Sequence, residues 1–116
     1  MGFVCVILES PFANQDKFLF NRNKRYLALA MLDCLKRGEA PFASHGLYPQ
    51  CLDDNIPEQR ELGIQAGFAW RTVAVKTVVY QDLGISKGME YGISHSKELK
   101  IPIEYRSLDG WRLEEQ

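Results

Sequence analysis

The sequence has no paired cysteine motif and few histidines, which limits the kinds of site it can hold. Its three cysteines, Cys5, Cys34 and Cys51, lie far apart, and none belongs to a Cys-x-x-Cys pair. Cys5 and Cys34 sit inside apolar patterns, where a buried thiol is expected. With two histidines and no third ligand at metal-binding spacing, the sequence predicts no metal site. We also expect no cofactor.

The net charge is small, and the apolar runs of the sequence are short. A formal net charge of -1 gives no general attraction to nucleic acid or to anionic membranes, so nucleic acid is an unlikely partner. No apolar run approaches the roughly 20 residues needed to cross a bilayer. No basic leader precedes the first apolar segment. We therefore expect a cytoplasmic protein without a membrane partner.

What remains is the composition of an ordinary globular protein. The chain has 116 residues, of which 46% are hydrophobic and 25% charged, enough for a core without disulfide bonds. It contains no repeat, low-complexity segment or linker. The sequence therefore predicts a single domain over residues 1–116.

Strand and helix patterns alternate along the chain. Short apolar segments predict strands over residues 3–8, 40–43, 73–80 and 101–106. Amphipathic or capped segments predict helices from Asn21 or Asn23 to Gly38, over 57–71 and over 86–99. The turn at Asp109-Gly110 leaves room for a short edge strand. The alternation predicts an α/β three-layer sandwich of the Rossmann-like or flavodoxin-like kind, with a mainly parallel sheet of four to five strands.

Polar and aromatic side chains follow the predicted strands, at the sheet edge where open α/β proteins bind ligands. They are Glu9, Ser10, Pro11 and Phe12 after the first strand, Ser44, His45 and Tyr48 after the second, and Asp82 after the third. Carboxylates pair with ribose hydroxyls, and aromatic rings stack on a base. The sequence therefore predicts a small nucleoside-type or nucleotide-type ligand.

Two further segments are candidate anion contacts. The helix predicted to begin at Ser86, with Lys87 and Gly88 in its first turn, presents backbone N–H groups that suit a phosphate. Arg25 belongs to a basic cluster at another predicted helix start, where the helix dipole disfavours cations. That cluster is either an anion contact or a solvated face.

Four strings, ILESPF, GEAPFASHGLY, VVYQDLGISKGMEYGI and IPIEY, resemble the nucleoside 2-deoxyribosyltransferase-like superfamily, and most closely its small phage and prophage members. The resemblance covers about residues 3–107. It implies that the Ser10-Pro11-Phe12 turn shapes the pocket and that Asp82 contacts the nucleoside. It also implies that the segment ending at Met89 precedes the catalytic glutamate. Symmetric oligomers are typical of that superfamily, so a homo-oligomer is expected.

The chain departs from the transferases at the catalytic position itself. Their nucleophilic glutamate lies four residues after the glycine that matches Gly88, and this chain has Gly92 there. Glu90 is two residues earlier, about 200° around the helix, so it should point elsewhere. Glu9 at a strand end could act as a displaced nucleophile or base.

Two hypotheses follow from this departure. The favoured one is a non-enzymatic nucleotide-binding protein. In a phage, it would sequester a nucleotide immune signal in the host cytoplasm, either an ADP-ribose derivative or a cyclic nucleotide. The alternative is an N-glycosidase or deoxyribosyltransferase with Glu9 as the catalytic acid. A glycine at position 92 favours binding over turnover.

Overall fold

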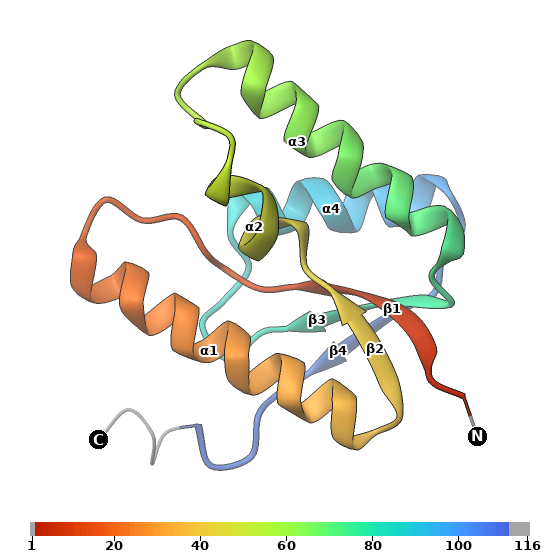
Figure 1. Ribbon diagram of the computed structural model, residues 1–116. Helices are drawn as coiled ribbons and strands as arrows, with labels where there is room; N and C mark the ends of the chain where they lie inside the picture. The colour runs from red at the N-terminus through yellow and green to blue at the C-terminus, as the bar shows by residue number, and fades with distance from the viewer. Residues whose placement is uncertain (1, 112–116) are drawn as a thin grey trace.

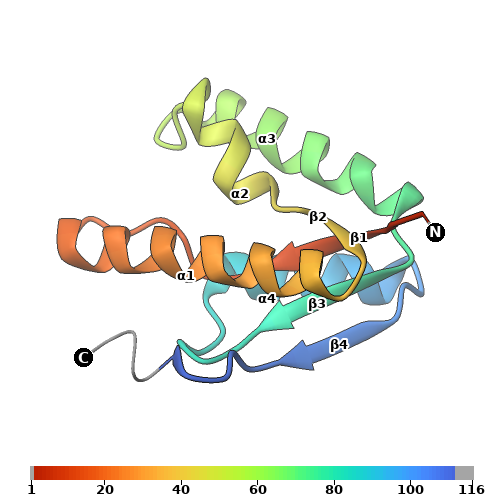
Figure 2. The same cartoon turned by 60° about the horizontal axis from the view of Figure 1, so that its bottom comes forward.

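Four parallel strands form a single sheet in the computed structural model, which describes residues 2–111. The strands are β1 (Val4–Glu9), β2 (Glu39–Phe42), β3 (Lys76–Tyr80) and β4 (Ile103–Arg106), in the order β2-β1-β3-β4. Figure 2 shows the arrows of β1, β3 and β4 pointing the same way. The predicted α/β class with a parallel sheet is confirmed, with four strands in the described residues.

Helices cover both faces of this sheet (Figure 1). They are α1 (Lys17–Lys36), α2 (Ser44–Leu47), α3 (Pro57–Ala69) and α4 (Lys87–Glu98), with short 3-10 turns η1 (Tyr48–Gln50) and η2 (Trp70–Val73). Helix α1 lies on one face, and α3 and α4 lie on the other. This arrangement confirms the three-layer sandwich.

The hydrophobic core has one part on each face of the sheet. Toward α1, the buried residues are Val6, Leu8, Tyr26, Leu27, Ala30, Cys34, Val78, Tyr80 and Trp111. Toward α4, Val79 packs with Met89, Ile93 and the partly buried Ile103. Because strands of a parallel sheet are covered on both faces, they need apolar residues at successive positions. Burial of Cys34 is confirmed, whereas Cys5 is exposed because the start of β1 is uncovered, with Val4 44% exposed.

Helix α1 begins earlier than the sequence predicts. Its cap is Asp16, whose carboxylate accepts N–H bonds from Phe18 at 2.8 Å and Leu19 at 3.2 Å. The prediction that Asn21 or Asn23 caps the helix is therefore wrong. Asn23 is buried inside the helix, and its amide donates to the Phe12 carbonyl at 3.0 Å. This bond fixes the loop that follows β1.

The third strand also differs from its prediction. Residues 73–75 have strand-like side chains, but Val73 ends η2 and β3 begins only at Lys76. The chain must turn from α3 into the sheet here, and the Ala74 N–H bonds the Arg71 carbonyl at 3.3 Å. The possible edge strand after Gly110 extends into residues 112–116, which lie outside the described residues.

The strand order creates a natural ligand site. The connection from β1 to β2 runs through α1 on one face, and the connection from β3 to β4 runs through α4 on the other. Chain segments therefore diverge beyond the carboxyl ends of β1 and β3, which is the topological switch point where open α/β sheets bind ligands. Within residues 2–111, no helix has the length and apolar character to cross a membrane.

Candidate functional site

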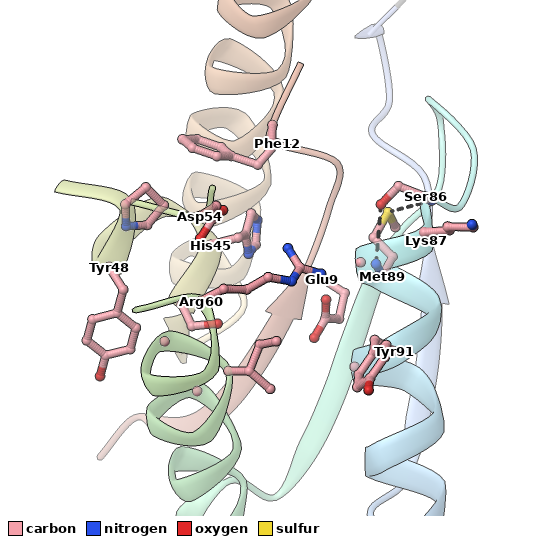
Figure 3. Close-up of a pocket in the computed structure, with 18 of the residues that line it drawn as sticks. Glu9, Phe12, His45, Tyr48, Asp54, Arg60, Ser86, Lys87, Met89 and Tyr91 are labelled. Carbon is pink, nitrogen blue, oxygen red and sulfur yellow. Dashed lines mark hydrogen bonds between the residues drawn. The ribbon is translucent and has the colours of Figure 1, made fainter. Parts of the chain in front are cut away.

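A cavity of about 460 Å³ opens at this switch point, between the segments after β1 and β2, helix α3 and the start of α4 (Figure 3). Its volume lies within the range of small-molecule sites. Most residues predicted from the strand ends and from the α4 start line it: Glu9, Ser10, Pro11, Phe12, Ser44, His45, Tyr48, Ser86, Lys87, Gly88 and Met89. The fold therefore brings together segments that are far apart in the sequence.

Two of the predicted site residues, Asp82 and Arg25, do not line this cavity. The Asp82 carboxylate accepts from the Tyr26 hydroxyl at 2.5 Å and from the Leu108 N–H at 2.9 Å. The Arg25 guanidinium lies 5.6 Å from the centre of the Trp111 ring. The Asp82 side chain therefore joins α1 to the C-terminal segment instead of facing the pocket.

Glu9, the last residue of β1, brings a carboxylate to the cavity and pairs with a buried arginine. Its Oε2 accepts from Arg71 Nη2 at 2.6 Å, and the Arg71 side chain is 3% exposed. The guanidinium also donates to the Ser96 hydroxyl at 3.0 Å and to the Gly92 carbonyl at 3.2 Å. Arg71 thus ties β1 to α4 and fixes the carboxylate in place.

Burial sets the protonation of this carboxylate. Desolvation raises the pKa of Glu9 to about 7, although the Arg71 charge and hydrogen bond lower it. Near neutral pH the group therefore exists in both forms. It accepts hydrogen bonds when ionised and donates one when protonated.

The Glu9 carboxylate leaves no space for a side chain at position 92. A Cβ atom on Gly92 would collide with the Glu9 carboxylate and lie 2.7 Å from Arg71 Nη2. The space beside Gly92 is therefore filled from β1. Glu90 is exposed and does not line the cavity, as its position on the helix predicted.

His45 and Ser10 form an uncharged polar pair in the cavity wall. His45 Nε2 and Ser10 Oγ are 2.9 Å apart, and the ring of Phe12 meets the imidazole edge-on with centroids 5.7 Å apart. Burial lowers the pKa of His45 to about 4, so the imidazole is neutral at physiological pH. The pair offers a ligand oriented hydrogen-bonding groups without adding charge.

Helix α3 supplies one wall of the cavity, which the sequence interpretation missed. The lining residues recur on one helical face and continue into η2: Arg60, Gly63, Ile64, Gly67, Phe68 and Arg71. This spacing of three and four residues was the available signal. Gly67 has a packing role, since its Cβ would lie 2.7 Å from the Ser44 hydroxyl. The strand ends alone therefore do not identify Phe68 and Arg71.

The start of α4 has fewer groups that could contact a phosphate than the sequence predicted. The Ser86 hydroxyl caps the helix by accepting from the Met89 N–H at 3.2 Å. In Figure 3 the Lys87 ammonium points away from the other labelled residues. A phosphate contact at this helix start would therefore rest on backbone N–H groups alone. Among residues 2–111, no cluster of three or more potential metal ligands is present.

The comparison with protein families places the chain. Residues 4–106 match the family described as "Domain of unknown function (DUF7768)", so the chain belongs to that family. No curated protein matches the chain. No solved structure matches it either.

Proposed function

We propose that this member of the DUF7768 family binds a nucleoside or nucleotide in the cavity beside Glu9 and holds it without turnover. The observation that carries the proposal is the cavity of about 460 Å³ at the switch point, in which an oriented carboxylate faces aromatic and apolar walls. A ribose has hydroxyls for the carboxylate, and a base has a flat face for the rings.

The cavity lining contains groups suited to a sugar and groups suited to a base. Glu9 and the neutral His45–Ser10 pair provide hydrogen-bonding groups at the ends of the strands. Phe12, Phe68 and Tyr91 provide aromatic surface, and the rings of Phe68 and Tyr91 stack with centroids 6.4 Å apart. A sugar beside the polar groups and a base beside the rings would use both surfaces.

Holding a ligand requires affinity but no chemistry. We extend the proposal to sequestration of a nucleotide signal, such as an ADP-ribose derivative or a cyclic nucleotide. The phage setting and the homo-oligomer belong to the same proposal, and both rest on the resemblance to the transferase-like superfamily. Two of the strings that carry this resemblance, ILESPF and VVYQDLGISKGMEYGI, contain residues that line the cavity.

Calorimetric titration with a panel of nucleosides and nucleotides tests binding. Glu9→Gln should weaken affinity by about tenfold or more, because hydrogen bonds to charged groups are worth 1.5–3 kcal/mol. Glu90→Gln is the matched control, since it makes the same chemical change on an exposed residue outside the cavity. Ligand recovered intact by chromatography after heat denaturation supports holding. Failure of every panel member to bind would refute the proposal.

A second candidate function is favoured by one observation. The resemblance places the nucleophilic glutamate at position 92, and the Glu9 carboxylate fills the space beside Gly92. A glycine at that position therefore does not remove the acid from the cavity. The chain would then be an N-glycosidase or deoxyribosyltransferase with Glu9 as nucleophile or base. Release of free base by the wild type, abolished in Glu9→Gln, would favour this function over binding alone.

A further inference from the structure

We infer that the ligand carries a phosphate and that Arg60 is the side chain that contacts it. This inference rests on the proposed function, and it narrows the ligand class from nucleosides and nucleotides to nucleotides. It also assigns an orientation, with the sugar toward Glu9 and the phosphate toward α3.

The position of Arg60 is the first support. Arg60 is the fourth residue of α3 and lines the cavity. Figure 3 shows its side chain extending from the helix into the cavity toward Glu9. Arg60 is exposed, so its guanidinium is hydrated at the mouth of the cavity and is accessible to a ligand that enters there.

The missing partner of Arg60 is the second support. Asp53, Asp54, Glu58 and Glu61 are all within seven residues of it in the sequence. Within residues 2–111, however, no carboxylate forms an ion pair with its guanidinium. Asp54 lines the same cavity without pairing. The local sequence offers four acids, and the side chain bonds to none of them.

Among the other charged groups of the described cavity, the unpaired Asp54 carboxylate opposes an anion, whereas Glu9 and Lys87 leave Arg60 available. Glu9 is already paired with Arg71 at 2.6 Å, so it neither needs Arg60 nor presents an uncompensated negative charge to an incoming anion. The ammonium of Lys87 is directed away. Arg60 is therefore the cation in the described cavity that remains available to a ligand.

Helix energetics do not explain an arginine at this position. Cations in the first turn of a helix interact unfavourably with the helix dipole, and acids are preferred there. A guanidinium presents a planar set of N–H donors that matches two phosphate oxygens at once. A bound phosphate would satisfy the side chain and offset the unfavourable position.

The experiment is a calorimetric titration of paired ligands, each nucleoside 5′-monophosphate beside its nucleoside, with inorganic phosphate as a third probe. The wild type should bind the monophosphate more tightly than the nucleoside. Arg60→Ala should weaken monophosphate binding by about tenfold or more and change nucleoside binding by less than about twofold. Arg60→Lys keeps the charge but loses the planar donors. Its affinity for the monophosphate should therefore lie between those of the wild type and Arg60→Ala.

Arg37→Ala is the matched control, because Arg37 is an exposed arginine at the end of α1 that pairs with Asp33 at 3.0 Å. It should change neither affinity, and circular dichroism should show every variant folded. Equal wild-type affinities for nucleoside and monophosphate would overturn this inference and leave the proposed function standing. Equal losses for both ligands in Arg60→Ala would also overturn it. Absence of binding by any nucleoside or nucleotide would overturn both.

Discussion

At the scale of single residues, Gly92 and Glu9 depend on each other. The proposed resemblance to the transferases predicts the loss of a catalytic side chain at Gly92. In the folded molecule the backbone of Gly92 borders the Glu9 carboxylate and its carbonyl accepts from Arg71. The substitution and the carboxylate from β1 are therefore one arrangement. Its parts come from residues 9, 71 and 92, so sequence spacing alone does not reveal it.

Gly92→Ala should lower the free energy of unfolding by about 1–3 kcal/mol, because the added methyl group collides with buried groups that are held by hydrogen bonds. Gly88→Ala, in the same helix, is the control. A Cβ there would have the Ser86 hydroxyl as its nearest neighbour, at 4.0 Å, so the variant should gain up to about 1 kcal/mol from helix propensity. Urea unfolding measures both. Equal effects of the two substitutions would show that position 92 is not crowded.

Glu9 should make stability depend on pH. Its pKa is raised from 4.5 to about 7 in the folded protein, so between these values the folded state binds more protons than the unfolded state. The free energy of unfolding should then fall as pH rises through this window. The buried His45 has the opposite slope below pH 6.5, since its pKa is lowered to about 4, but it is present in both wild type and Glu9→Gln. The difference between their unfolding free energies therefore isolates Glu9.

That difference should decline from about pH 4.5 to about pH 7 and be flat above it. Urea unfolding at a series of pH values provides the measurement. A difference that rises with pH would mean that the Arg71 pair outweighs burial and that the carboxylate is ionised throughout.

At the scale of elements, the segment after β3 serves stability and the segment after β1 serves the site. An acid lies at or just beyond the end of each of these strands, with Glu9 as the last residue of β1 and Asp82 two residues after β3. Glu9 faces the cavity between α3 and α4, whereas Asp82 faces α1 and the chain after β4. The sequence marks each as an acid beyond a strand and does not show which way the chain turns next.

Asp82→Ala should therefore reduce stability without reducing affinity. It removes the acceptor of the Tyr26 hydroxyl and of the Leu108 N–H. We expect a loss of about 1–3 kcal/mol in the free energy of unfolding. Affinity for a nucleotide, measured by titration at a temperature where the variant is folded, should change by less than about twofold. A tenfold fall in affinity would place Asp82 in the site after all.

At the scale of the whole molecule, the parallel sheet and its layers could be predicted because short apolar strand segments alternate with helical segments along the chain. The strand ends and the start of α4 then predicted 11 of the 23 residues that line the cavity, since parallel strands share one edge. Phe68 and Arg71 escaped prediction because they look like an ordinary surface pattern until the helix is placed over the sheet. The Glu9–Arg71 pair joins residues 62 positions apart, a contact that only the fold creates.

The central claim is that a nucleotide binds in the cavity beside Glu9. Amide NMR spectra of the labelled protein, recorded while a nucleoside 5′-monophosphate is added, test it most directly. We expect saturable shifts concentrated at Ser10, Phe12, His45, Gly67 and Gly92, with little change at Asp82. The ligand should be recovered intact. Shifts confined to other surfaces, or no saturable shift with any nucleotide of the panel, would contradict the claim.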